Sequence, residues 1–239
     1  MESDLPAAPG FPIVMSMKRP VRNLIPSLAC AALAFAVSNV YAQDPLKAIK
    51  KANTAEAISH ARQIGLALLE FETNYGFFPS EKTLANVEET LGEKLPAGEK
   101  SSNSLLRQLF AAGITAQESM FSANIIGVMK GGEQLEPKAA LGKGKNAFAY
   151  IAGLNMAGNP ARPLLVCPLI PGTTKFDPKP FGGKAIILRI DCSVQALPIE
   201  EDGRVLQGGV ELLSKEHEIW KGMEGKAPDI RYPDIAAEG

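Results

Sequence analysis

The sequence has few of the residues on which most catalytic and metal sites depend. Its 239 residues include two histidines, three cysteines and one tryptophan. His60 lies within a helix-like stretch and His217 near the C-terminus, and no Cys-x-x-Cys, His-x-x-x-His or EF-hand pattern occurs. Histidine-dependent catalysis and metal binding therefore have few places to occur. We expect no catalytic residue, no metal site, no cofactor and no enzymatic activity.

The sequence also lacks an excess of either charge. Its 25 Lys and Arg residues are matched by 26 Asp and Glu residues, which leaves a formal net charge of −1. A nucleic-acid-binding protein is expected to have a basic excess or basic clusters, whereas the basic runs here are short, as at Lys50-Lys51 and 143–145. These runs are interpreted as solvated surface, and no nucleic-acid partner is expected.

The first 42 residues have the composition of an export signal behind a leader. Residues 1–16 show no periodicity and are expected to be a disordered leader or a misassigned start. Residues 17–42 begin with basic residues, continue with an apolar stretch over 24–37 and end in a small-residue cleavage site before Gln43. We therefore expect a signal peptide, and a protein exported to the periplasm or the cell surface.

Two alternatives to signal removal are open, and both predict a membrane-attached adaptor. Residues 23–42 could stay as a membrane anchor, although Pro26 and Ser38 interrupt the apolar run. Cys30 could be lipidated, although Ser27 stands where a lipobox usually has Leu. A membrane is expected as a partner only if this segment is retained.

The strongest pattern in the chain is that of an amphipathic helix. Apolar residues recur at intervals of three and four, which places them on one helical face; they are Ile58, Ala61, Ile64, Leu68, Phe71 and Tyr75. Gly76 and Pro79 then follow in the order that ends a helix. A helix from about Pro45 to Tyr75 is predicted, within a helical part over 43–79.

A helix that closes in Tyr75-Gly76-Phe77-Phe78-Pro79, preceded by residues 62–68, resembles that of the major pseudopilin of type II secretion systems and of type IV pilin-like proteins. In that family the helix lies across a small antiparallel sheet, and subunits pack through their helices into a fibre. The resemblance implies two sets of site residues. These are core or subunit-contact residues (Ile58, Ile64, Leu68, Phe71 and Tyr75) and a helix-terminating turn (Gly76, Phe78 and Pro79).

The chain departs from this family near its start and in its acidic residues. A prepilin peptidase site has Gly, Phe, a polar residue and then an unbroken apolar helix, whereas Gly10-Phe11 is followed by Pro12. Major pseudopilins also bind calcium in a loop near the C-terminus. That loop is not matched here, so no metal is assigned to the local candidates, which are Asp191, Glu200, Glu201 and Asp202.

A helical insertion is predicted over 80–145. Its expected helices are 81–91 with Ser80 as N-cap, 105–110 with Ser102 or Asn103 as N-cap, and a shorter one from Thr115 with Glu118 as capping-box partner. The periodicity then changes to two, which predicts an antiparallel sheet over 146–206. Its four expected strands are 147–153, 163–169, 184–190 and 193–199, the last two forming a hairpin.

Cys167 and Cys192 lie in or beside neighbouring candidate strands of an exported protein, which makes them a candidate disulfide. Two buried thiols are the alternative, and a cysteine nucleophile paired with His217 lacks a motif. Pro168 and Pro198 are expected at strand ends or edges. Residues 207–239 are predicted to hold a helix over 210–221 and a tail that runs extended over the surface.

These patterns predict an α+β domain over 43–239, with a long N-terminal helix packed on a four-stranded antiparallel sheet and short inserted helices, and the resemblance implies that this domain is pilin-like. The expected function is that of an exported pseudopilin-like structural or interaction protein of a type II secretion or type IV pilus-like assembly. Its expected partners are other pilin-like or secretion-system subunits, copies of itself included. The alternatives are a periplasmic small-ligand binder or enzyme on the same fold, and a membrane-anchored adaptor.

Overall fold

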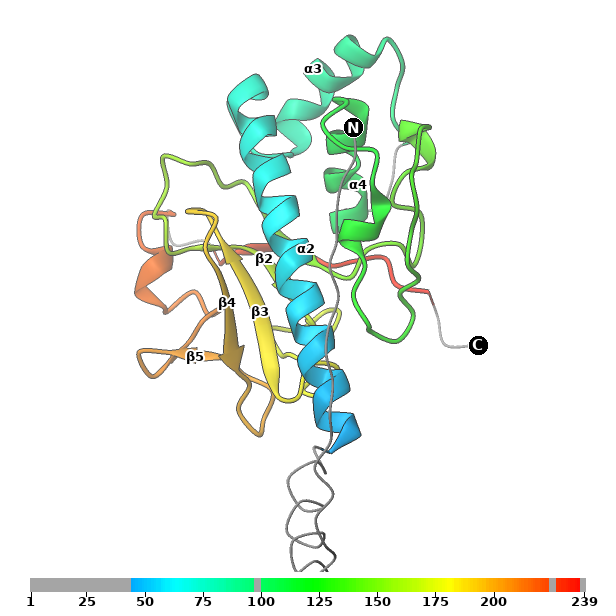
Figure 1. The fold of residues 1–239 in the computed structure, drawn as a ribbon. Coiled ribbons are helices and arrows are strands. Elements are labelled where there is room, and N and C mark those ends of the chain that lie inside the picture. The colour runs from blue at the N-terminus through cyan, green and yellow to red at the C-terminus, as the bar shows by residue number, and fades with distance from the viewer. Residues whose placement is uncertain (1–43, 97–99, 224–226, 237–239) are drawn as a thin grey trace, which may run out of the picture. The chain divides into compact units, whose positions relative to one another are not determined.

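The computed structural model describes residues 44–96, 100–223 and 227–236 (Figure 1). The expected leader, signal peptide and membrane anchor therefore lie outside the described residues. The elements in chain order are α2 (Pro45–Tyr75), α3 (Glu81–Leu91), α4 (Ser102–Leu106), α5 (Gln108–Ala111), η1 (Glu118–Phe121), η2 (Pro137–Ala139), β1 (Ala149–Ala152), β2 (Pro163–Cys167), β3 (Lys184–Arg189), β4 (Val194–Pro198), β5 (Leu206–Gln207), β6 (Val210–Glu211), η3 (Glu218–Trp220) and β7 (Asp229–Arg231).

Helix α2 begins and ends where its sequence predicts. The Asp44 side chain accepts a hydrogen bond from the amide of Leu46 at 3.0 Å, and Pro45 occupies the first turn, where its missing N–H costs nothing. Gly76 closes the helix in the left-handed conformation, with φ 78°, and its N–H donates to the carbonyl of Glu72 at 2.7 Å. The predicted boundaries are confirmed.

The described strands form a five-stranded antiparallel sheet and a separate two-stranded ribbon. The sheet order is β4-β3-β2-β1-β7, and all four pairings are antiparallel. The four predicted strands are β1 to β4, and the hairpin between β3 and β4 is confirmed. Pro198 ends the edge strand β4, and Pro168 follows β2 directly, as expected of residues that cannot donate to a ladder.

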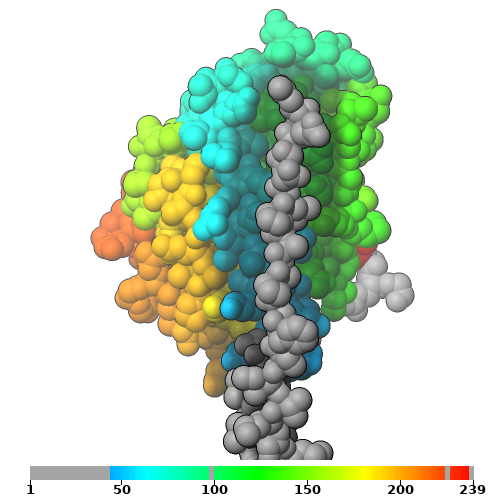
Figure 2. All heavy atoms as spheres, in the orientation of Figure 1, coloured from blue at the N-terminus to red at the C-terminus, as the bar shows by residue number. Residues whose placement is uncertain are grey.

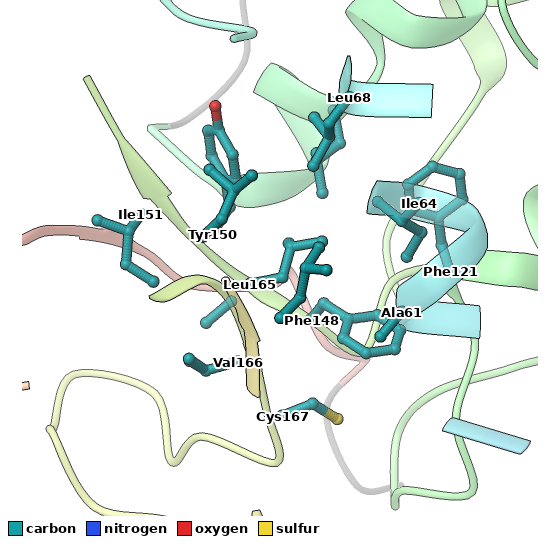
Figure 3. Packing of buried hydrophobic residues seen from close by; sticks show 14 of the residues in the cluster. Ala61, Ile64, Leu68, Phe121, Phe148, Tyr150, Ile151, Leu165, Val166 and Cys167 are labelled. Atoms are coloured by element: carbon teal, nitrogen blue, oxygen red, sulfur yellow. The ribbon is translucent and has the colours of Figure 1, made fainter. Parts of the chain in front are cut away.

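Helix α2 lies across this sheet and buries one face against β3 and β4 (Figure 1). Figure 3 shows Ala61, Ile64 and Leu68 of α2 beside Phe148 and Leu165 of the strand layer, and all five are buried. Gly65 lies tightly against β3, because a β-carbon there would lie 3.0 Å from Cδ1 of Leu188. The described part of the chain is therefore an α+β fold built around one helix and one sheet.

The helical insertion is confirmed over α3 and shorter than expected beyond it. Ser80 and Thr83 form a capping box at the start of α3, which ends at Gly92 as predicted. Ser101, not Ser102 or Asn103, caps α4, because its side chain accepts from the amide of Ser104 at 3.3 Å. The remaining turns of the insertion are a four-residue helix and two 3-10 helices.

One prediction for the C-terminal region is wrong, and another is incomplete. The expected helix over 210–221 is replaced by β6, a turn and the 3-10 helix η3. The chain bends between β6 and η3, and this bend brings the apolar side chains of both segments into the core. The tail is extended, as predicted, but it forms an edge strand that was not predicted: β7 pairs with β1, and Arg231 forms ion pairs with Asp229 at 2.7 Å and with Glu81 of α3 at 2.8 Å. The sheet thus gains a fifth strand from the chain's last described residues.

The predicted disulfide is also wrong, since Cys167 and Cys192 are free thiols. In the β2–β3 pairing Cys167 lies opposite Ile186, whereas Cys192 follows Arg189 at the other end of β3. The three residues from Ile186 to Arg189 alone span about 10 Å. A disulfide needs α-carbons closer than about 7 Å, so the register of the sheet prevents the bond.

Candidate functional site

The predicted contact residues on α2 divide into core residues and partly exposed ones. Ile64, Leu68 and Phe71 are fully buried inside the described domain, so they stabilise the fold and are not available to a partner subunit. Ile58 and Tyr75 are only partly buried at the border of the same cluster. Tyr75 stacks on Phe71 with ring centroids 4.5 Å apart. The contact role implied by the resemblance thus does not apply to the three central residues.

The helix-terminating turn attaches the end of α2 to the sheet. Gly76 reverses the chain, Phe78 is buried, and the carbonyl of Pro79 accepts a hydrogen bond from the hydroxyl of Tyr150 at 2.9 Å. Tyr150 belongs to β1 and is fully buried, and burial raises the pKa of its hydroxyl well above the ordinary value. The hydroxyl therefore stays protonated and donates, which gives the predicted turn a structural role.

The outer face of α2 is not covered by any described residue. Of the large apolar side chains of α2 that are exposed, Leu66, at 63%, lies on this face. Leu46, at 57%, lies on the core-facing side and Ile49, at 54%, on the flank, and both are exposed in the first turns of the helix. Figure 2 shows α2 at the surface between the yellow and orange strands and the green helical insertion.

A groove of about 580 Å³ opens beside the first turns of α2. Its apolar lining includes Leu46 and Ile58 of the helix and Phe181 of the loop before β3. The hydroxyl of Thr54 joins the two walls, since it donates to the carbonyls of Lys50 at 2.7 Å and of Phe181 at 3.4 Å. The groove therefore continues the core-facing side of α2 past the end of the sheet, where described residues no longer cover it.

Four lysines surround this groove, with one acidic residue, Asp44, among the lining side chains. Lys47, Lys50 and Lys51 are spaced to share one side of the helix, and Lys184 joins them from the start of β3. Sequence reasoning assigned Lys50-Lys51 to solvated surface and did not single out the other two lysines or Phe181. The spacing of three and four residues between Lys47, Lys50 and Lys51 could have indicated a shared helical side in the sequence. Lys184, in contrast, is brought to the groove only by folding.

A second, more polar groove of about 430 Å³ lies around Arg189 at the β3–β4 edge. The guanidinium donates to the carbonyl of Ala161 and to the amide oxygens of Gln195 at 3.4 Å and Gln207 at 2.9 Å. Burial lowers the pKa of Arg189, and neighbouring Asp191 opposes that effect. Since Arg189 joins three separate segments through these bonds, we assign it a structural role.

The titratable residues singled out in the sequence have structural partners. Both ring nitrogens of His217 are used: Nδ1 accepts from the amide of Ile219 at 3.2 Å and Nε2 lies 3.1 Å from the carbonyl oxygen of Gln207. Nδ1 of His60 lies 2.8 Å from the carbonyl oxygen of Ser122. Burial raises the pKa of the Cys167 thiol, which removes it as a nucleophile near neutral pH.

The acidic candidates likewise belong to turns. Asp191 accepts from the amide of Ser193 at 2.9 Å, and Asp202 pairs with Arg204 at 2.6 Å. Within 44–96, 100–223 and 227–236, no group of three or more His, Cys, Asp or Glu residues is arranged to hold a metal ion. Over the same ranges no helix has both the length and the apolar character needed to cross a membrane.

Two surfaces thus remain as candidates for function, the outer face of α2 and the lysine-ringed groove at its start. Comparison of the chain with protein-family models, with curated proteins and with solved structures gives no match.

Proposed function

We propose that this chain is an exported, pilin-like structural or interaction subunit connected with a type II secretion or type IV pilus-like assembly, and that it is not an enzyme. The observation that carries the proposal is the arrangement of α2. One face of this 31-residue helix is buried across an antiparallel sheet, and the opposite face is open to solvent along its length. Such a helix can hold a head domain with one side and bind a neighbouring subunit with the other.

The chemistry of the open face supports helix-to-helix contact. Beside Leu66 it presents the small exposed residues Ala52, Ala55 and Ser59. Small side chains let a second helix approach closely, while Leu66 supplies apolar area that is removed from water on contact. The partners we propose are copies of this chain or other pilin-like subunits.

Replacing Leu66 with glutamate is expected to weaken self-association at least tenfold in sedimentation velocity. A carboxylate on the contact face has to lose water when two helices pack, which is costly without a partner charge. Leu135→Glu is the matched control, since Leu135 is 76% exposed and lies outside α2. If the wild-type chain stays monomeric at all concentrations and in the presence of its native membranes and secretion subunits, the proposed role is wrong.

Export makes a separate prediction. Protein isolated from its native cells is expected to begin at Gln43, because the small residues before it form a signal-cleavage site. Intact mass together with N-terminal sequencing measures this directly. A chain that still carries residues 23–42 would instead support the membrane-anchored adaptor.

A further inference from the structure

The lysine-ringed groove at the start of α2 combines an apolar lining with a cluster of positive charge. Its lining is mainly apolar, from Leu46, Ala55, Ile58 and Phe181, and its rim holds Lys47, Lys50, Lys51 and Lys184. No ion pair joins any of these lysines to another described residue. Positive charge is thus concentrated around uncovered apolar surface.

The fold brings the four lysines of the groove together from α2 and from the start of β3. The Lys50 side chain passes over Gly182, where a β-carbon would lie 3.6 Å from its Cδ. Lys47 and Lys51 are exposed on either side of it, and Lys184 is exposed at the start of β3. Lysine stems can lie on apolar surface while their ammonium groups reach outward, so the charges point away from the groove floor.

Leu46 and Ile49 extend this surface at the very start of the helix. Each is more than half exposed, with 57% and 54% of its surface open to solvent. Exposed apolar side chains beside several lysines, at one end of an element, are the combination that binds the boundary between lipid headgroups and acyl chains.

We propose that this end of the domain docks on the surface of an anionic phospholipid bilayer, with the four lysines against lipid phosphates and with Leu46 and Ile49 at the headgroup level. The attraction depends on residues 44–184 of the described domain alone, whether or not a preceding segment is retained. It does not rest on the proposed assembly role. Bilayer docking would orient the chain with the start of α2 towards the membrane.

The test is flotation of the full-length chain with vesicles of phosphatidylcholine alone or mixed with phosphatidylglycerol. Insertion of apolar side chains contributes to binding of both kinds of vesicle. The partition coefficient for the mixed vesicles divided by that for phosphatidylcholine alone therefore measures the effect of charge. Lys47→Gln combined with Lys51→Gln is expected to lower this ratio roughly 30-fold, because each lysine near an anionic surface contributes about a fivefold effect. Raising the salt concentration is expected to lower it as well.

The matched control is Lys215→Gln combined with Lys221→Gln, which removes the same charge from exposed residues that do not line the groove. This control is expected to keep the wild-type ratio. Equal losses in both double variants, or an unchanged ratio in the groove variant, would overturn the proposal. So would a groove variant that keeps the ratio but alters lipid-free sedimentation, since the groove would then bind another copy, for example through the exposed acidic turn at 200–202.

Discussion

Replacing Leu68 with alanine is expected to lower the free energy of unfolding by about 3 kcal/mol, the middle of the range for a buried leucine. Leu68 is fully buried between α2 and the sheet, where removal of its three outer carbons leaves a cavity that the rigid surroundings fill only in part. Urea unfolding followed by circular dichroism measures the change, with the slope of the transition kept constant.

The same helix supplies the control for this prediction. Leu66, two residues earlier, is 63% exposed, and Leu66→Ala is expected to change stability by less than about 0.5 kcal/mol. Comparison of Leu68→Ala with Leu66→Ala in the same unfolding experiment therefore distinguishes the buried face of α2 from the exposed one. Similar losses from both substitutions would show that the outer face is also packed, which contradicts its assignment as an open association surface.

The second large effect is expected at Asn146, which holds a buried polar cluster together. Its side-chain nitrogen donates to the Ser102 hydroxyl at 2.8 Å, to Asn103 Oδ1 at 3.2 Å and to the carbonyl of Phe148 at 3.1 Å. Its side-chain oxygen accepts from the amide of Phe148 at 3.0 Å. The residue is fully buried, so water does not replace these bonds.

Asn146→Ala is expected to cost about 3 kcal/mol of stability, because it leaves the buried amide of Phe148 without an acceptor and opens a cavity. Asn146→Leu refills the volume without restoring the bonds. We expect it to be as unstable as the alanine variant in urea unfolding, whereas Asn124→Ala, at an exposed position, should be neutral. Recovery of stability in the leucine variant would show that packing, rather than hydrogen bonding, is what Asn146 contributes.

The cluster around Asn146 also explains how the helical insertion is fixed to the strand layer. The hydroxyl of Ser102 donates to the carbonyl of Phe148 at 2.8 Å, and Oδ1 of Asn103 accepts from the amide of Asp234 at 3.0 Å. The two bonds join residues 46 and 131 positions apart in the chain. Their assembly was not visible in the sequence, where Ser102 and Asn103 looked only like alternative helix caps.

Elements with local signals were the ones that the sequence predicted well. Helix α2 has its apolar period, Pro45 at its start and Gly76 at its end, and α3 has Ser80 and Gly92 as caps. Each of these signals acts within a few residues of the position it determines. The turn between β3 and β4 was likewise found from its local sequence, because a hairpin brings neighbouring residues together.

Elements whose conformation depends on distant partners were missed. Strand β7 lies in a proline-rich tail and becomes a strand only because β1 offers an edge and Arg231 pairs with Glu81. The disulfide was expected from the nearness of two strands in sequence, whereas the register of β2 on β3 places the thiols too far apart. The spacing of Leu212, Leu213 and Trp220 resembled a helix, yet a hairpin and η3 bring them into the core.

The sequence by itself determined the helix that organises this protein, the strands and hairpin that follow it and the scarcity of histidine and cysteine, since periodicity, caps and composition are local or additive properties. Only the tertiary structure decided which side of α2 is open and that Lys184 and Phe181 join the helix lysines around one groove. It also decided that Cys167 and Cys192 remain apart. Those outcomes follow from pairings between residues far apart in the chain, which burial and sheet register select and no short stretch encodes.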